Sequence, residues 1–237
     1  DRVLLAEEVY GGTSAFALHD LTRFGVVVDR FSSLEPATLR AQLQLPAKMV
    51  VFESPINPTL RVADIGALVA IAKEHGALVV FDGPFSPPPI QRPLQLGCDL
   101  VVHSASKFFG GHSDVLAGVV AGPHALLKPI EAFRRRSGGV LAPDVAWLIE
   151  RSWPTLGLRL AAQQAAALAV AEGLQAEVRA GRLDEVRYPG LPDHPDRALV
   201  EKQMNGGGAV VSVVVPGGLP GALRVIDHLE VIARAAS

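Results

Sequence analysis

Short apolar runs alternate with helical patterns through the first half of this 237-residue chain. The runs predicted as strands are Val3–Leu5, Gly25–Asp29, Met49–Phe52, Ala77–Phe81, Asp99–His103 and Ala117–Val120. Most are continuously apolar, which is typical of strands covered on both faces. Helices are predicted between them at Thr13–Thr22, Glu35–Gln44 and Ile65–His75. This order indicates βαβ units and an α/β fold with a doubly wound, mostly parallel sheet.

The second half of the chain has a different pattern. Helices rich in Ala, Leu and Gln are predicted at Pro143–Arg151 and Gly157–Ala180, and residues 188–195 are dense in turn formers. Beyond them we expect a glycine-led strand at Gly206–Val215, a helix at Leu219–His228 and a short strand at Val231–Ala233. The pattern predicts a large domain over residues 1–157 and a smaller C-terminal α+β domain over residues 158–237.

Composition excludes several classes of function. Lys+Arg total 22 against Asp+Glu 24, a net charge of -2, whereas nucleic-acid binding usually requires a basic surplus. The single cysteine, Cys98, excludes a disulfide framework and a multi-cysteine metal site. No apolar run approaches the roughly 18 residues of a membrane span, and no signal peptide is visible in residues 1–20, so we expect a cytoplasmic protein. A mean hydropathy of +0.29 predicts apolar surface buried against another chain or further sequence.

Polar groups follow two of the predicted strands. Asp82 ends one apolar strand, and Ser104, Ser106 and Lys107 follow the next. Functional groups of doubly wound folds lie at the carboxyl ends of strands. Each segment alone also fits a simpler interpretation, because Asp82 could cap a turn and Lys107 could be a solvated lysine in a Gly-rich loop. Together they match pyridoxal phosphate, which requires a carboxylate on its ring nitrogen, hydroxyls on its phosphate and a lysine on its aldehyde.

Two histidines near this lysine raise the question of a metal site. His103 and His112 flank Lys107, with Asp114 close by. A third ligand with suitable spacing is not apparent. We therefore expect no metal.

Longer motifs extend the pattern over nearly the whole chain. They are VYGGT (9–13), ESPINP (53–58), ADIGALVAIAKEHGALVVFD (63–82), QRPLQLGCDLVVHSASK (91–107) and GGHSDVLAG (110–118), followed by WLIERSWPTLGLR, YPGLPDHP and QMNGGG. With these motifs the chain resembles the Cys/Met-metabolism family of pyridoxal-phosphate enzymes. That family includes cystathionine γ-synthase, cystathionine γ-lyase, methionine γ-lyase and the O-acylhomoserine sulfhydrylases. The resemblance implies the fold-type I architecture of pyridoxal-phosphate enzymes.

The resemblance also implies roles for individual residues. Lys107 would hold the cofactor covalently and then act as general base and acid. Asp82 would pair with the ring nitrogen, and Ser104 and Ser106 would bind the phosphate. Asn57 would donate a hydrogen bond near the ring oxygen and the substrate, although it also fits a turn before Pro58.

Two further residues are expected at the site by the same resemblance. Tyr10 would lie over the cofactor ring and protonate the leaving group. Ser237, the last residue of the chain, would lie near the substrate carboxylate. Tyr188, the other tyrosine, fits a turn-packing role instead.

Four positions depart from the family pattern. Gly83-Pro84 stands where the family usually has Asn-Thr, which removes two polar groups beside Asp82. Ala236 replaces a glutamate common in cystathionine enzymes and so favours a smaller, more apolar substrate. Gly12 replaces the cysteine typical of methionine γ-lyases and so disfavours methionine as the substrate. The substrate therefore stays open between these indications.

The resemblance also concerns what lies outside this sequence. Family members carry an N-terminal segment that reaches the neighbouring subunit's phosphate, and a later arginine that binds the substrate carboxylate. Both fall outside residues 1–237, so we expect a large domain without its N-terminal part and an incomplete small domain. The family implies a homotetramer, built as a dimer of dimers with shared sites.

The expected activity is a pyridoxal-phosphate-dependent C–S lyase of sulfur amino acids. It would eliminate the γ-substituent of methionine, homocysteine or cystathionine and release 2-oxobutyrate, ammonia and a thiol. The alternatives are γ-replacement by a cystathionine γ-synthase or O-acylhomoserine sulfhydrylase, and a β-lyase that releases pyruvate. A different class is a catalytically incomplete relative or fragment that binds the cofactor only.

Overall fold

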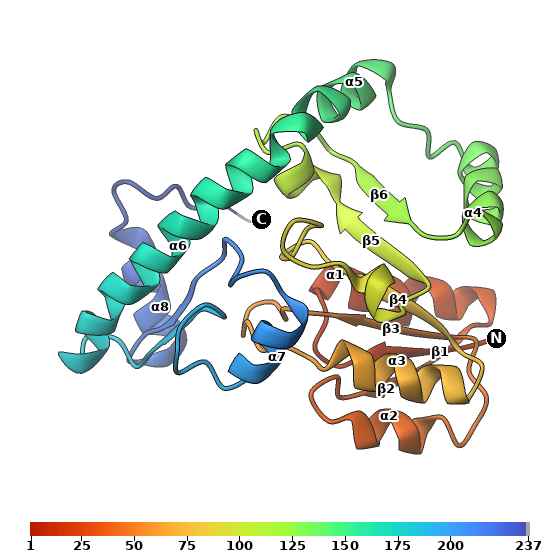
Figure 1. The fold of residues 1–237 in the computed structure, drawn as a ribbon, viewed down its shortest axis with the longest axis horizontal. Helices are drawn as coiled ribbons and strands as arrows, with labels where there is room; N and C mark the ends of the chain where they lie inside the picture. The colour runs from red at the N-terminus through yellow and green to blue at the C-terminus, as the bar shows by residue number, and fades with distance from the viewer. Residues whose placement is uncertain (236–237) are drawn as a thin grey trace.

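A six-stranded sheet forms the centre of the computed structural model, which describes residues 1–235. Its strands lie in the order β2-β1-β3-β4-β5-β6 (Figure 1). Strands β1 to β5 are parallel, and β6 pairs antiparallel with β5. The strands are β1 (Arg2–Ala6), β2 (Val27–Phe31), β3 (Met49–Glu53), β4 (Leu78–Asp82), β5 (Leu100–Ser104) and β6 (Gly118–Ala121). The predicted strands and the mostly parallel α/β sheet are confirmed.

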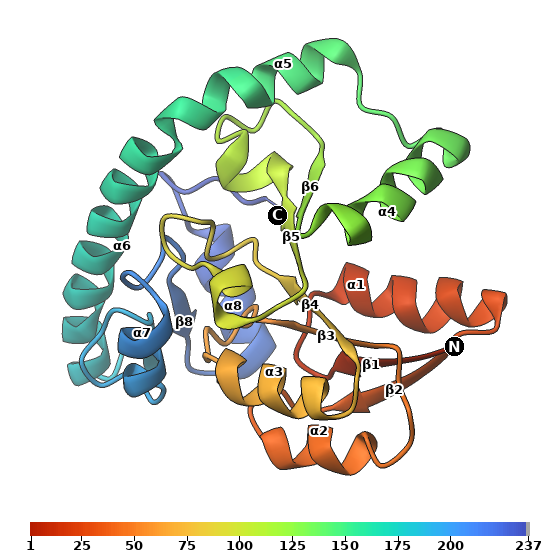
Figure 2. The ribbon, with the colours of Figure 1, turned by 45° about the vertical axis from the view of Figure 1, so that its right-hand side comes forward.

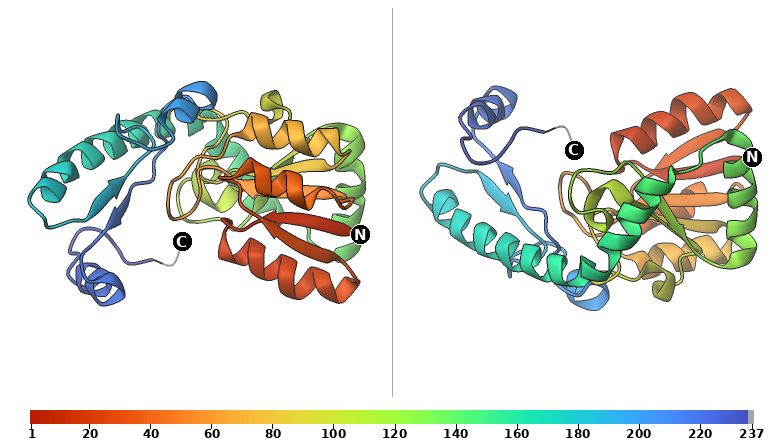
Figure 3. Two further views of the ribbon diagram at one scale, coloured as in Figure 1. Left: turned by 90° about the horizontal axis from the view of Figure 1, so that it is seen from below. Right: turned by 90° about the horizontal axis from the view of Figure 1, so that it is seen from above.

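Helices cover both faces of this sheet. A helical run made of α1 (Gly11–Ala15), η1 (Phe16–Asp20) and η2 (Leu21–Phe24) lies on one face. The other face carries α2 (Pro36–Gln42) and α3 (Ile65–Glu74), as Figure 3 shows. The side chain of Asp64 starts α3 by accepting a hydrogen bond from the Ala67 N–H at 3.1 Å, an N-cap that satisfies one free amide of the first turn.

The core of the large sheet is made by the continuous apolar runs. Phe52 and Phe81 meet edge to face with ring centroids 5.6 Å apart, and Leu4, Val50 and Val79 are fully buried beside them. Burying each such side chain contributes about 1.5–3 kcal/mol. These runs are apolar on both sides because helices cover both faces.

The second half of the chain leaves the sheet along one long helix. Figure 2 shows α6 (Leu156–Arg179) running from the main sheet to the side of a smaller antiparallel pair, β7 (Glu185–Arg187) and β8 (Ser212–Val214). Tyr188 is 1% exposed in the core between α6 and this pair. Its hydroxyl donates to the Gly208 carbonyl at 2.9 Å, in keeping with the predicted packing role. The remaining elements are η3 (Pro93–Leu96), η4 (Ala105–Phe109), α4 (His124–Ser137), α5 (Pro143–Ser152), η5 (Trp153–Thr155), α7 (Arg197–Gln203) and α8 (Gly218–Asp227).

Several predictions for the second half are wrong. The strand expected at Val231–Ala233 is absent, and the one expected at Gly206–Val215 is limited to Ser212–Val214. Gly206 and Gly208 have φ of 100° and 81°, which bends the chain away from an extended strand. The helix α4 was not predicted, because Pro129 stands inside it and proline normally signals a helix end. The short elements β7 and α7 lie among turn formers and were also missed.

None of the helices in residues 1–235 combines the length and the apolar character that crossing a lipid bilayer requires.

Candidate active site

The predicted functional groups meet at the carboxyl edge of the main sheet. Asp82 ends β4, and Ser104 ends the adjacent strand β5, where Asp82 is in register with Val102. Lys107 follows in the turn η4 and is exposed, with φ −87° and ψ −120° in an otherwise helical segment. The strand register therefore brings a carboxylate, a hydroxyl and a lysine to one edge.

Asp82 is a partly buried carboxylate with one polar side-chain neighbour. The Thr13 hydroxyl donates to its Oδ2 at 3.4 Å. Burial raises the pKa of Asp82, and the bond from Thr13 opposes that rise. A desolvated carboxylate of this kind gains most from a cationic partner such as a protonated pyridine nitrogen. Thr13 was not singled out from the sequence, although it belongs to the VYGGT motif.

The loop that carries Lys107 is held by backbone and side-chain contacts. The Ser106 Oγ accepts a hydrogen bond from the Ala117 N–H at 2.9 Å. The Lys107 carbonyl accepts from the Gly111 N–H at 2.7 Å. Arg159 of α6 donates to the Phe108 carbonyl at 2.8 Å. Arg159 was missed, since no pattern in the sequence shows that α6 reaches this loop.

Tyr10 and Asn57 are tied to one buried carboxylate. Glu53 ends β3 and is 5% exposed. Its Oε2 accepts from the Tyr10 N–H and its Oε1 from the Asn57 N–H, each at 2.8 Å. Burial raises the pKa of Glu53 to about 7; these two bonds lower it and nearby Asp82 raises it. Glu53 lies in the quoted ESPINP motif but was not predicted as a site residue.

The ring of Tyr10 is half exposed and lies against Gly12. A Cβ at Gly12 would come within 2.5 Å of the Tyr10 Cε1. The absence of a side chain at residue 12 is therefore what permits this ring position. The cysteine expected there in methionine γ-lyases would displace the ring.

Behind the strand ends lies His103, a buried imidazole. Its ring packs edge to face on Phe109 with centroids 5.1 Å apart. Its Nδ1 has no hydrogen-bond partner within residues 1–235. Burial lowers the pKa of His103 to about 4, so the ring is neutral at pH 7.

The donor set fits pyridoxal phosphate. Asp82 supplies a desolvated carboxylate, Lys107 an exposed amine, and Ser104 and Ser106 hydroxyls on the same loop. The Ser106 Oγ accepts the Ala117 N–H at 2.9 Å and donates to the Ala117 carbonyl at 3.4 Å, a long bond that a phosphate oxygen would replace by rotation of the hydroxyl. Phosphate, ring nitrogen and aldehyde each have a partner of suitable chemistry.

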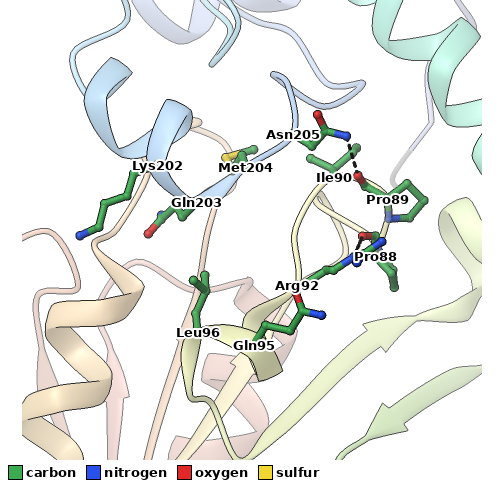
Figure 4. A pocket seen from close by; sticks show the side chains of 10 residues that line it. All are labelled: Pro88, Pro89, Ile90, Arg92, Gln95, Leu96, Lys202, Gln203, Met204 and Asn205. Atoms are coloured by element: carbon green, nitrogen blue, oxygen red, sulfur yellow. Dashed lines mark hydrogen bonds between the residues drawn. The ribbon is translucent and has the colours of Figure 1, made fainter.

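Other features lie apart from this edge. Ser237 falls outside the described residues, so its predicted role stays a prediction. Figure 4 shows a cavity of about 260 Å³ between residues 88–90 and 202–205, and another of about 390 Å³ lies beside Arg61 and His194. Neither is lined by Lys107, Asp82 or Tyr10. Residues 1–235 contain no cluster of three or more His, Cys, Asp or Glu side chains suited to a metal ion.

Solved structures with the same fold define the class of this protein. The whole chain matches cystathionine γ-lyase from Lactobacillus plantarum with a TM-score of 0.92 and 34% identity, over 61% of that chain. It matches cystathionine γ-synthase from Xanthomonas oryzae pv. oryzae with a TM-score of 0.94 and 32% identity, again over 61% of that chain. The fold is that of a fold-type I pyridoxal-phosphate enzyme.

The sequence narrows this class to one family. Residues 1–237 match the family model of the Cys/Met metabolism PLP-dependent enzymes, and the chain belongs to that family. Its cofactor is pyridoxal 5'-phosphate. The chain is 38% identical to L-methionine γ-lyase from Pseudomonas putida, covering 100% of this chain and 59% of that protein. It is 39% identical to O-succinylhomoserine sulfhydrylase from Pseudomonas aeruginosa, covering 98% and 57%. It thus spans somewhat over half the length of these relatives.

Proposed function

We propose that the protein is a C–S lyase that removes the γ-substituent of methionine, homocysteine or cystathionine and releases 2-oxobutyrate, ammonia and a thiol. The observation that carries this proposal is the placement of Lys107 and Asp82 at the ends of adjacent strands, inside motifs of a pyridoxal-phosphate family. The similarity to an L-methionine γ-lyase supports elimination as the reaction.

Each site residue has a role that its chemistry supports. When bound, the cofactor supplies an electron sink for the charge left at the substrate Cα. Lys107 would take the Cα proton and return it later as general base and acid, and its exposed position on the loop leaves its amine free to reach the substrate. Asp82 holds the ring nitrogen protonated, since a carboxylate beside it favours the cation.

The remaining predicted residues position the cofactor and substrate. Ser104 and Ser106 would donate to the phosphate, and Asn57 would donate to the ring oxygen and contact the substrate. Tyr10 would stack on the ring and give a proton to the leaving sulfur. Ser237 contacts the substrate carboxylate.

Product analysis tests the activity. Purified protein with pyridoxal phosphate is incubated with methionine, homocysteine or cystathionine, and keto acids are identified. We expect 2-oxobutyrate, and we expect Lys107→Ala to abolish both the product and the visible absorbance of the bound cofactor. Pyruvate from cystathionine would indicate a β-lyase instead. Cofactor absorbance without turnover of these substrates or of an activated homoserine ester would indicate a catalytically incomplete relative that only binds the cofactor.

Replacement is the second candidate. The 39% identity to an O-succinylhomoserine sulfhydrylase favours it as much as the methionine γ-lyase favours elimination. Lys107 and Asp82 serve both reactions. Formation of a thioether or thiol product only from an activated homoserine ester would establish replacement and overturn the lyase assignment.

We further propose that the protein is a cytoplasmic homotetramer with a large domain over residues 1–157 and a small domain over 158–237. Exposed apolar side chains support association, including Phe24 at 82% and Phe133 at 66%. Such side chains are candidates for burial between subunits. Light scattering of the purified protein is expected to give four times the subunit mass, and a monomer at all concentrations would contradict the proposal.

A further inference from the structure

Glu53 is a buried carboxylate that reaches two loops at once. It lies at the end of β3, in register with Asp82 at the end of β4, so the two side chains point to the same face of the sheet. One oxygen accepts the Tyr10 N–H from the loop after β1, and the other accepts the Asn57 N–H from the loop after β3. Both carboxylate oxygens are thus engaged by backbone donors.

These two contacts set the starting geometry of both loops. Tyr10 is the N-cap of α1, the residue just before its first turn, and its carbonyl accepts the Ser14 N–H at 3.0 Å. The Tyr10 N–H on Glu53 therefore fixes the helix start to the strand end. Asn57 lies in a turn closed by the Leu60 N–H, which donates to the Ile56 carbonyl at 2.7 Å. Glu53 links that turn to the same point.

We propose that Glu53 is a positioning residue for the cofactor ring, acting through the backbones of Tyr10 and Asn57. The inference rests on the proposed cofactor-dependent function, in which those two residues contact the ring. A carboxylate suits this task because it is acceptor-only when ionised and has two oxygens for two amide donors. No other side chain of this size offers that combination.

The close carboxylate of Asp82 gives the arrangement a second consequence. Two carboxylates side by side in a partly desolvated edge repel one another, and a cationic ring nitrogen beside Asp82 relieves that repulsion. Burial of Glu53, like the repulsion from Asp82, raises the pKa of Glu53 and so disfavours its ionised form. Ionised Glu53 and the bound cofactor are therefore mutually favourable.

Glu53→Gln is the direct test. The amide keeps the size but offers one acceptor, so its NH₂ must face either the Tyr10 or the Asn57 donor. We expect the dissociation constant for pyridoxal phosphate to rise about tenfold or more, with a changed visible circular dichroism band. Glu8→Gln is the matched control, since Glu8 accepts the Ser33 N–H at 2.9 Å on the other side of β1. It is expected to reduce stability without changing cofactor affinity or the band.

Residue-resolved amide hydrogen exchange on the cofactor-free wild type covers the case in which Glu53→Gln does not fold. The Tyr10 and Asn57 amides are expected to be protected together. Free exchange of both, or a Glu53→Gln protein with unchanged affinity and band, would overturn the inference. A wild type that does not bind the cofactor would overturn it too. A wild type that binds the cofactor normally but cleaves no sulfur amino acid would count against the proposed function alone.

Discussion

Gly83, the residue after Asp82, has no room for a side chain. A Cβ there would lie 2.8 Å from both the Phe81 Cε1 and the His103 Cε1. Both rings are buried in the core, so neither can move without disturbing its neighbours. The family's usual asparagine at this position would require the same rings to shift.

We expect Gly83→Ala to destabilise the protein by about 1–3 kcal/mol, because overpacking forces the surrounding side chains off their preferred rotamers. Urea unfolding followed by circular dichroism measures this change. Gly173→Ala is the matched control, since Gly173 lies within α6 with nothing near its Cβ position. That substitution should stabilise by about 0.5–1 kcal/mol. Equal effects of both substitutions would refute the steric argument.

Residues at strand ends were predictable, and residues that support them were not. Asp82 and Lys107 follow apolar runs, so the general geometry of doubly wound sheets places them at one edge. Glu53 has the same position at the end of β3, but a carboxylate beside a proline turn also fits a solvated side chain. Its function depends on which backbone amides approach it, and that is a property of the tertiary structure.

Helix α6 connects the small antiparallel pair to the lysine loop through the buried Leu156 and Leu160 and through hydrogen bonds of Arg159. Arg159 donates to the Phe108 carbonyl and also to the Ser152 carbonyl, at 2.8 and 3.1 Å. A Cβ at Gly111 would lie 2.0 Å from its Nη1, so the guanidinium lies directly against this loop. The helix thereby restrains the segment that carries Lys107.

We expect Arg159→Met to release this restraint. Methionine keeps much of the packing volume but donates no hydrogen bond, so the Phe108 carbonyl loses the Arg159 donor, whereas the Ser152 carbonyl keeps the Thr155 hydroxyl at 3.0 Å. The cost is about 2 kcal/mol of stability, together with faster amide exchange over residues 105–111. Hydrogen exchange by mass spectrometry measures the loop directly. Arg135→Met, on exposed α4, is the control and should leave the loop unchanged; equal exchange in the two variants would contradict the role of α6.

Elements with a covered apolar face were predictable from the sequence. The strands of the main sheet and helix α3 follow continuous or periodic apolar patterns, and the structure has them within a few residues of the predicted bounds. Helix α4 carries apolar residues at helical spacing (Leu126, Ile130 and Phe133), but Pro129 inside it signals a helix end, so the sequence did not reveal it. The short β7 forms through its pairing with β8, and a three-residue strand has too little pattern to detect.

At the scale of the whole molecule, two buried groups act on stability in opposite directions with pH. Burial lowers the pKa of His103 from 6.5 to about 4. Between these values the unfolded chain binds a proton that the folded chain does not, so stability falls as the pH drops. Glu53 has its pKa raised from 4.5 to about 7. The folded chain keeps its proton where the unfolded chain loses it, so stability falls as the pH rises through this range.

Each of these pKa shifts changes the free energy of unfolding by about 3 kcal/mol. The two effects of pH on stability therefore largely cancel between pH 4.5 and 6.5 in the cofactor-free protein. Glu53→Gln removes one of them. Relative to wild type, the free energy of unfolding of this variant should rise by about 3 kcal/mol from pH 4.5 to pH 7. His103→Gln should lose about as much relative to wild type as the pH rises from 4 to 6.5. Urea unfolding at fixed temperature across this range measures both differences. Curves parallel to wild type would mean that neither group is desolvated in the folded protein, and the neutral His103 and the raised pKa of Glu53 would both have to be abandoned.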